Sequence, residues 1–397
     1  MPQSRLPQGG TNLFQQIKEV CTNAEAGGQK LYRLSIGQPT GPALMSARQA
    51  AADALLSGKQ EMHEYQDNAC LLCPDFASRF VQCHVKTDLS TLEIAYLPIP
   101  GIKPMLGLIP LACGVGTGCL AVLTTTKPGY PTPADWCRYF GKSSVFHTHI
   151  VLNRQNQFRF PPVILNANED VKPDLVMMNY PHNPSGQVAS RQWLEELCAL
   201  AEKLNIRLFN DAAYAILAHD DEHCALTDVA TNFPKLSWAE AFSASKAGNF
   251  TGWRVGAMVG SPDFIGDIAK IKGNTDSGFN AALAIGVLHA FEHDRQSIEA
   301  VRLIYENRLK NLIGTLLQCG MRLAVEPKAG FFTFWQRPSR AFGQNIESAE
   351  QFNFLMIERT GLVGVHFEPY IRYAVCGQDS ECVEEIRSAF SAAQIAY

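Results

Sequence analysis

The sequence predicts an α/β protein in which a mostly parallel sheet lies between helices and a smaller α+β domain follows. Residues 174–180 and 206–209 are short apolar runs, and residues 190–204 between them carry leucines at helical spacing. A strand, a helix and a strand within so few residues indicate a right-handed crossover in a parallel sheet. Past Gln296 the pattern changes to a long amphipathic helix followed by mixed strands and helices.

The remaining elements follow from the same two periodicities. Further strands are expected at residues 92–99, 239–243, 330–335 and 370–375. Further helices are expected at residues 301–317, 348–359 and 380–392, with another beginning at Lys103. We expect an N-terminal arm with part of the small domain at residues 1–45, a large domain at 46–295 and a small domain at 296–397.

The composition of the chain limits the kinds of molecule that it is expected to bind. The chain has 397 residues, of which 46% are hydrophobic, and a formal net charge of −4. This length suits two domains, and the charge lacks the basic excess that attracts nucleic acid or anionic lipid. The first ten residues lack the apolar core of a secretion signal, and no run reaches the roughly 18 apolar residues of a membrane span. We expect a cytoplasmic protein that binds small molecules, without nucleic-acid or membrane partners.

The twelve cysteines are expected to be reduced and mostly buried, because no secretion signal accompanies them. Cys70 and Cys73 form a C-x-x-C pair without a second pair or histidines at zinc-like spacing. Structural packing is therefore favoured over redox or metal chemistry, and no metal site is expected.

Lys246 lies among small residues in the segment SASKAGNFTGWRVG. Read alone, a lysine in such a loop is usually a solvated surface residue. The alternative is a lysine that condenses with an aldehyde, because burial and a nearby cation lower the pKa of an amine. Arg254 and the hydroxyls of Ser243 and Ser245 would then bind a phosphate group.

Asp211 ends an apolar run in the segment FNDAAY, where a carboxylate needs a partner. It could cap a following helix. It could also pair with the protonated nitrogen of a pyridine ring, as in pyridoxal 5′-phosphate (PLP), and keep the ring electron-withdrawing. Tyr214 and the amide of Asn183 could then reach the phenolic oxygen of the same ring.

Two further motifs are weak signals by themselves. Gly101-Ile102-Lys103 follows a strand and opens a helix, so its backbone N–H groups could bind a phosphate. Tyr130, in the turn Pro-Gly-Tyr-Pro, could stack on a ring, although a tyrosine there is also ordinary packing. Four polar features follow inferred strands, where open α/β sheets bind ligands: Gly101-Ile102-Lys103, Asn183, Asp211 with Tyr214, and Ser243 with Lys246.

Taken in order, the motifs resemble those of the class I/II aminotransferases of PLP fold type I, the aspartate aminotransferase superfamily. The resemblance runs from Gly37, in Ser-Ile-Gly-Gln-Pro, to Arg372, in the segment EPYIRYAVCG. It includes NPSG at Asn183, D-x-A-Y from Asp211 and S-x-S-K ending at Lys246. The stretches NFTGWRVG and KGNTDSGF look most like the diaminopimelate and broad α-amino-acid aminotransferases.

The resemblance implies a fold with a mostly parallel seven-stranded sheet, and it implies the role of each residue. Lys246 would hold PLP as an aldimine and then shuttle a proton, with Asp211 and Tyr214 beside it as catalytic groups. The other residues implied to bind the cofactor are Tyr65, Gly101, Ile102, Lys103, Tyr130, Asn183, Ser243, Ser245 and Arg254. Gly37, Asn183 and Arg372 would bind the substrate.

The same resemblance implies an activity and an assembly. The enzyme would move an amino group from an α-amino acid to a 2-oxo acid in two half-reactions, with 2-oxoglutarate and glutamate as one pair. It would be a homodimer with shared active sites, in which Tyr65 and a residue near Asp276 and Ser277 reach the phosphate bound by the neighbouring subunit.

Alternatives on the same scaffold are a PLP-dependent β-lyase or decarboxylase, and a non-catalytic PLP-binding regulatory protein. The chain also departs from the family pattern. The segment before Arg372 is shortened, residues 66–70 replace a glycine-containing turn, and Pro131-Thr132-Pro133 lacks a second tyrosine. The amino donor is therefore left open.

Overall fold

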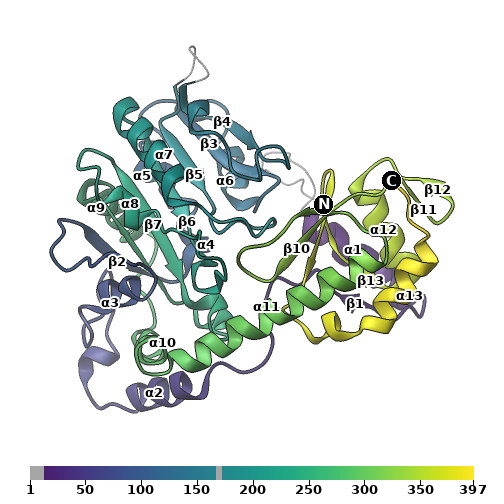
Figure 1. Ribbon diagram of the computed structural model, residues 1–397. Helices are drawn as coiled ribbons and strands as arrows, with labels where there is room; N and C mark the ends of the chain where they lie inside the picture. Colours follow the sequence, from purple (N-terminus) through teal and green to yellow (C-terminus); the bar gives the residue numbers. More distant parts are fainter. Residues whose placement is uncertain (1–12, 167–171) are drawn as a thin grey trace, which may run out of the picture.

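A computed structural model describes residues 13–166 and 172–397 and shows two lobes joined by one long helix (Figure 1). The larger lobe is built around a seven-stranded sheet, and the smaller lobe contains both ends of the described chain. Residues 1–12 of the predicted N-terminal arm lie outside the described residues. The domain boundaries near residues 45 and 295 stay predictions.

The large sheet is mostly parallel, as predicted. Its strand order is β2-β8-β7-β6-β5-β3-β4. The strands are β2 (Ala95–Ile99), β3 (Leu120–Lys127), β4 (Val145–Val151), β5 (Leu175–Met178), β6 (Arg207–Asp211), β7 (Trp238–Ser243) and β8 (Gly256–Gly260). Only β8 runs against its neighbours, because it pairs antiparallel with both β2 and β7. The other six strands therefore point the same way.

The predicted crossover between β5 and β6 is formed by α7 (Arg191–Leu204). The side chain of Ser190 accepts a hydrogen bond from the Trp193 N–H and so caps the first turn. Asn205, in the left-handed conformation, ends the helix. Of the four residues whose spacing predicted the helix, Leu194, Leu197 and Ala201 are buried and Leu204 is partly buried.

The helix expected from Lys103 is instead two short helices, α4 (Ile102–Met105) and α5 (Leu108–Ala112). They are separated at Gly107, where an added Cβ would lie 2.5 Å from the ring of Trp136. The sequence pattern does not reveal this close approach, because Trp136 comes from α6 (Thr132–Phe140), later in the chain.

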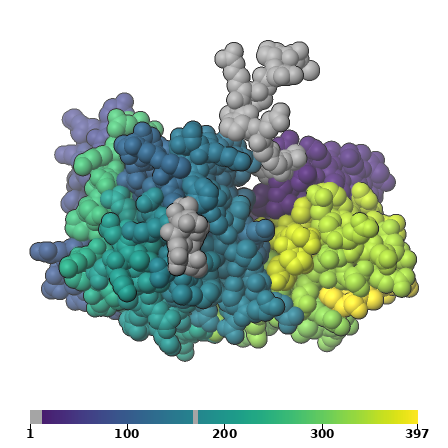
Figure 2. Space-filling view, turned by 90° about the horizontal axis from the view of Figure 1, so that it is seen from above, coloured from purple at the N-terminus to yellow at the C-terminus, as the bar shows by residue number. Residues whose placement is uncertain are grey.

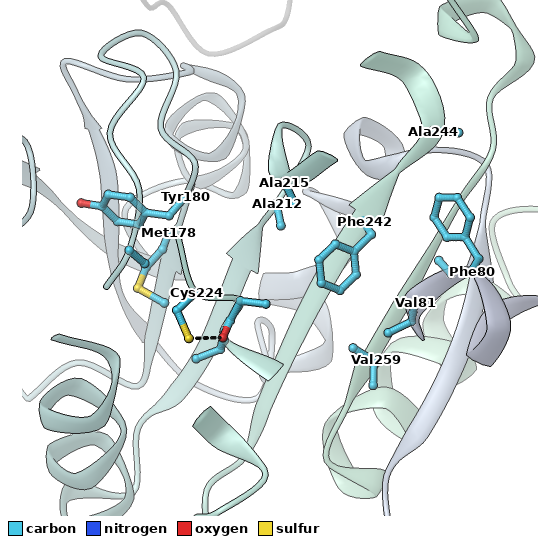
Figure 3. Packing of buried hydrophobic residues seen from close by; sticks show 14 of the residues in the cluster. Phe80, Val81, Met178, Tyr180, Ala212, Ala215, Cys224, Phe242, Ala244 and Val259 are labelled. Atoms are coloured by element: carbon cyan, nitrogen blue, oxygen red, sulfur yellow. Dashed lines mark hydrogen bonds between the residues drawn. The ribbon is translucent and has the colours of Figure 1, made fainter. Parts of the chain in front are cut away.

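Helices cover both faces of the large sheet. One face packs against α2 (Met45–Leu55), α3 (Phe76–Gln82), α7, α8 (Thr227–Ala230) and α10 (Ala281–His293). The other face packs against α4, α5, α6 and α9 (Pro262–Lys272). Figure 3 shows part of the first face, where Phe80 and Val81 of α3 lie beside Phe242 and Val259 of the sheet. The two buried layers hold the sheet in place, and polar residues gather at its edge.

The smaller lobe contains both helices and strands. The long joining helix, α11 (Arg295–Gln318), connects the larger lobe to its C-terminal part. Its antiparallel sheet has the order β14-β15-β10-β9, formed by Val365–Phe367, Tyr370–Ala374, Phe332–Gln336 and Leu323–Val325. The flanking helices are α1 (Leu13–Ala26), α12 (Ala349–Thr360) and α13 (Val383–Ala393). A short hairpin of β11 (Arg340–Ala341) and β12 (Gln344–Asn345) lies beside them.

The N-terminal and C-terminal parts of the chain meet in this lobe. Strand β1 (Tyr32–Arg33) pairs in parallel with β13 (Leu362–Val363). Helix α1 packs against α12 through Ile17 and Ile357, and Figure 2 shows the purple N-terminal helix against the yellow-green C-terminal part. The segment predicted to be shortened is a tight hairpin, in which Glu368 and Pro369 connect β14 to β15.

All twelve cysteines carry free thiols, and six of them are buried, including Cys70. In the described part of the chain, no helix combines the length and apolar character that crossing a membrane requires.

Lys272 makes a buried ion pair beneath the loop that carries Tyr65. Its side chain is 0% exposed, and its Nζ atom donates to the Asp276 carboxylate at 2.7 Å and to the Asp67 carbonyl at 3.0 Å. An added Cβ at Gly278 would lie 2.5 Å from the Asp67 nitrogen. This ammonium therefore holds the 66–67 and 276–278 loops together.

Replacing Asp276 by alanine should destabilise the protein by about 3 kcal/mol, because it leaves a buried ammonium without its counter-charge. Chemical denaturation measures the change. The matched control is Glu195→Ala, which removes an exposed partner of Arg191 at 4.0 Å and should cost less than about 1 kcal/mol. Equal losses in the two variants would show that the Lys272 pair is no stronger than a surface pair.

Candidate active site

A cavity of about 320 Å³ lies at the edge of the large sheet where the six co-directional strands end, and it faces the smaller lobe. Its lining contains most of the residues singled out in the sequence: Gly37, Ile102, Lys103, Tyr130, Asn183, Asp211, Tyr214, Ser243, Ser245, Lys246, Arg254 and Arg372. Gly101 is adjacent to the lining through Arg254. Tyr65 lies elsewhere on the surface, 77% exposed.

The strand directions explain why these residues meet. Asp211 and Ser243 are the last residues of β6 and β7, and Asn183 follows the end of β5. Arg254 precedes β8, but β8 is antiparallel, so its beginning lies at the same edge as the ends of its neighbours. The sheet thus gathers groups that are far apart in sequence.

Lys246 lies at the end of a short 3-10 turn that directly follows β7. Its Nζ atom donates a hydrogen bond to the Gly37 carbonyl at 3.0 Å. Burial lowers the pKa of the Lys246 amine to about 8, and the guanidinium groups of Arg254 and Arg372 act in the same direction. A considerable fraction of this amine is therefore unprotonated near neutral pH, as nucleophilic chemistry requires.

Asp211 is a buried carboxyl that forms no salt bridge with any residue the structure describes. It is 8% exposed, and it accepts a hydrogen bond from the Ala213 N–H at 3.2 Å. Burial raises its pKa to about 7, although that hydrogen bond and the charge of Lys246 oppose the rise. A cationic partner in the cavity would favour the charged form, so the site is suited to a protonated ring nitrogen.

Asn183 and Arg372 are joined across the boundary between the two lobes. The Nη1 atom of Arg372 donates to the Asn183 Oδ1 atom at 3.0 Å, and its Nη2 atom donates to the Ser35 carbonyl at 2.9 Å. The guanidinium stacks on Phe332, with 4.1 Å from Cζ to the ring centroid. Its Nε atom is buried and has no hydrogen-bond partner among residues 13–166 and 172–397. This permanently charged group is suited to a carboxylate ligand.

Arg254, which also lines the cavity, fits closely against Gly101. An added Cβ at Gly101 would lie 2.5 Å from the Arg254 Nη2 atom, and the φ of +81° at Gly101 favours glycine. Arg254 itself has a φ of +55°, an uncommon conformation for a residue with a side chain. Nearby, the Ser243 hydroxyl accepts a hydrogen bond from the Ser245 N–H at 3.1 Å.

Tyr214 lies against the smaller lobe, with its ring 5.6 Å from that of Phe332 between centroids. Burial raises the pKa of its phenol, so Tyr214 is a neutral hydrogen-bond donor at physiological pH.

Five more lining residues were not predicted from the sequence: Phe14, Asn179, Ala213, Thr251 and Phe332. Asn179 directly follows β5, so the strand-end criterion that selected Asn183 could also have found it. Phe14 belongs to α1, which the sequence patterns did not predict. Phe332 is in an expected strand, but its position in the cavity depends on how the two lobes pack.

The residues that line the cavity can be compared with the chemical groups of PLP. A buried carboxyl with a raised pKa, an amine with a lowered pKa and a glycine that leaves room for an arginine line one cavity. These are the groups that a pyridinium nitrogen, an aldehyde and a phosphate need. The residues present therefore fit PLP.

The model of the family described as aminotransferase class I and II matches residues 29–390. The chain belongs to this family. It is a PLP-dependent transaminase with a fold-type I architecture, as the sequence motifs predicted.

Similar proteins support this assignment. An LL-diaminopimelate aminotransferase of Natranaerobius thermophilus is 33% identical over 372 residues, which cover 91% of this chain and 92% of that protein. One of Methanocaldococcus jannaschii is 30% identical over 282 residues, which cover 70% of this chain and 64% of that protein. The aspartate aminotransferase of Rhizobium meliloti shares the fold, with a TM-score of 0.85, 19% identity and 99% coverage of both chains.

In the absence of cofactor, Asp211→Asn should stabilise the protein above neutral pH. The wild-type carboxyl has a folded-state pKa of about 7 against an ordinary value of 3.8. Its contribution to stability is therefore complete below pH 3.8, falls as the pH rises and is lost beyond pH 7. Thermal unfolding of the apo-proteins should show a midpoint about 2 °C higher for the variant at pH 8, and a smaller difference at pH 5. A difference independent of pH would contradict the raised pKa.

Gly101→Ala should weaken PLP binding about tenfold, because the new methyl group displaces Arg254 and strains the backbone. Equilibrium titration of the apo-protein with PLP measures the dissociation constant. Gly118→Ala is the matched control, since no heavy atom lies within 4 Å of an added Cβ there. If the two alanine variants bind PLP equally well, the contact between Gly101 and Arg254 does not matter for the cofactor.

Proposed function

We propose that this enzyme transfers an amino group from an α-amino acid to a 2-oxo acid, with glutamate and 2-oxoglutarate as one pair and Lys246 as the PLP-binding lysine. The observation that carries the proposal is the position of the Lys246 amine. It is buried, has a pKa of about 8 and lies in one cavity with the Asp211 carboxyl and the guanidinium groups of Arg254 and Arg372.

PLP supplies, when bound, an aldehyde that condenses with amines and a ring that withdraws electrons. In the proposal, Asp211 holds the proton on the ring nitrogen, and Tyr214 and Asn183 donate to the phenolic oxygen. Arg254, the hydroxyls of Ser243 and Ser245 and the Gly101–Lys103 segment bind the phosphate. Tyr130 stacks on the ring. The left-handed backbone of Arg254 is consistent with such a role, since strained residues concentrate at functional sites.

Arg372 binds the substrate α-carboxylate in the proposal, and Gly37 and Asn183 complete that subsite. The buried Nε atom without a partner supports this role, because a carboxylate would satisfy it. Lys246 would also be the base that accepts the proton from the substrate Cα and later returns it. A pKa near 8 suits both steps, since a group that accepts and donates should titrate near the working pH.

The proposed assembly is a homodimer with shared active sites. Tyr65 is exposed, and its loop contacts the loop of Asp276 and Ser277, with the Asp67 N–H donating to the Ser277 carbonyl at 3.2 Å. Both segments were expected to reach the phosphate of the neighbouring subunit. Their proximity supports a single contact region on a partner copy.

The amino donor is to be found by a half-reaction panel. Purified enzyme should absorb in the near ultraviolet to violet and lose that absorbance with a good donor, and glutamate should be among the donors. LL-diaminopimelate belongs in the panel because the relatives are named after it. With 2-oxoglutarate present, an active donor should yield new glutamate. Ammonia and pyruvate instead would point to β-elimination.

Borohydride reduction gives an independent test of the lysine. It should fix the cofactor on Lys246, as peptide mass analysis would reveal, and Lys246→Ala should not be labelled. Lys270→Ala is the matched control, because Lys270 is an exposed lysine outside the cavity lining and its loss should leave the labelling of Lys246 intact. Wild-type protein that binds no PLP would refute the proposed function.

A further inference from the structure

The hydrogen-bond ladder between β5 and β6 ends one residue before the cavity. Met178 and Asn210 are the last paired residues. Beyond them the strands separate, and asparagine side chains replace the backbone ladder. The side chain of Asn210 binds the backbone of Tyr180 twice. Its Oδ1 atom accepts a hydrogen bond from the Tyr180 N–H at 2.9 Å, and its Nδ2 atom donates one to the Tyr180 carbonyl at 2.9 Å. The neighbouring Asn179 lines the cavity.

Asn179 uses both ends of its side-chain amide. Its Oδ1 atom accepts from the Asn183 N–H at 2.9 Å, and its Nδ2 atom donates to the Asp211 carbonyl at 2.8 Å. Its own N–H donates to the Thr125 hydroxyl at 3.1 Å. Asn179 is 8% exposed, so water competes little for these bonds. One buried side chain thus fixes the spacing between Asn183 and Asp211.

The position of Asn183 determines where its own amide points. Its Oδ1 atom accepts from Arg372 at 3.0 Å, so its Nδ2 group is the end available as a donor to a ligand. The backbone on one side of Asn183 is held by Asn179, and Pro184 restricts the other side. A shift of this turn would move the donor relative to the Asp211 carboxyl.

We propose that Asn179 is a positioning residue for the proton chemistry of this enzyme, acting through Asn183 and Asp211. The proposal rests on the proposed function, in which those two residues contact the phenolic oxygen and the ring nitrogen of PLP. Asn179 keeps Asn183 and Asp211 at the separation that contact with opposite sides of one PLP ring requires. Its loss displaces the Asn183 donor, and the phenolic oxygen then retains its proton to a higher pH.

The test is a pH titration of the absorbance of the bound cofactor. Asn179→Leu, which is similar in size and makes no hydrogen bonds, should raise the midpoint of that titration by about one pH unit, the effect of one lost hydrogen bond to a charged group. Asn183→Ala should raise it by at least as much. The double variant should show no further rise, because both changes remove the same contact.

Asn210→Ala is the matched control. It removes an asparagine from the same strand ends, with bonds to Tyr180 and Glu240 but none to Asn183. It should lower the thermal midpoint and leave the absorbance midpoint unchanged. If Asn179→Leu does not fold, Asn179→Ser takes its place, with a rise in the same direction expected.

The outcomes separate the two proposals. An unchanged midpoint in the Asn179 variant, beside a raised one in Asn183→Ala, would overturn the positioning role. Equal rises in the Asn179 and Asn210 variants would also overturn it, because general loosening would then explain both. Failure of borohydride to label Lys246 in the wild-type enzyme would instead refute the proposed function.

Discussion

The common direction of six strands in the large sheet is the constraint on which the cavity depends. Their carboxyl ends face the smaller lobe together, and the reversed strand β8 adds Arg254 at its beginning. The two apolar layers keep this edge in place without occupying it. Charged groups can therefore be buried there at a spacing set by backbone hydrogen bonds. The shifted pKa values of Asp211 and Lys246 arise from this burial.

Two arginines, the Lys246 amine and the Asp211 carboxyl line one cavity. Arg254 comes from the larger lobe and Arg372 from the smaller one, so the distance between the two guanidinium groups depends on how the lobes pack. The hydrogen bond from Arg372 to Asn183 links that packing directly to the large sheet.

Much of this site could be predicted from the sequence because its residues lie in short motifs next to strands. Lys246, Asp211 and Asn183 each follow an apolar run that is recognisable by itself. The bond between Asn183 and Arg372 spans 189 residues, so its geometry appears only in the folded chain. A helix was expected to begin at Lys103, and α4 begins at Ile102, but the close approach of Trp136 at Gly107 comes from a later part of the chain. Helix α1 was missed, and with it the contribution of Phe14 to the cavity.

The pairing of β1 with β13 has a consequence for how the protein is made. The small lobe needs Tyr32 from near the start of the chain and Leu362 from near its end. During synthesis, the large lobe can therefore fold as a unit before the last strands of the small lobe have been made. Arg372 is on one of those strands. In that order of folding, Lys246, Asp211 and Arg254 come together before Arg372 reaches the cavity.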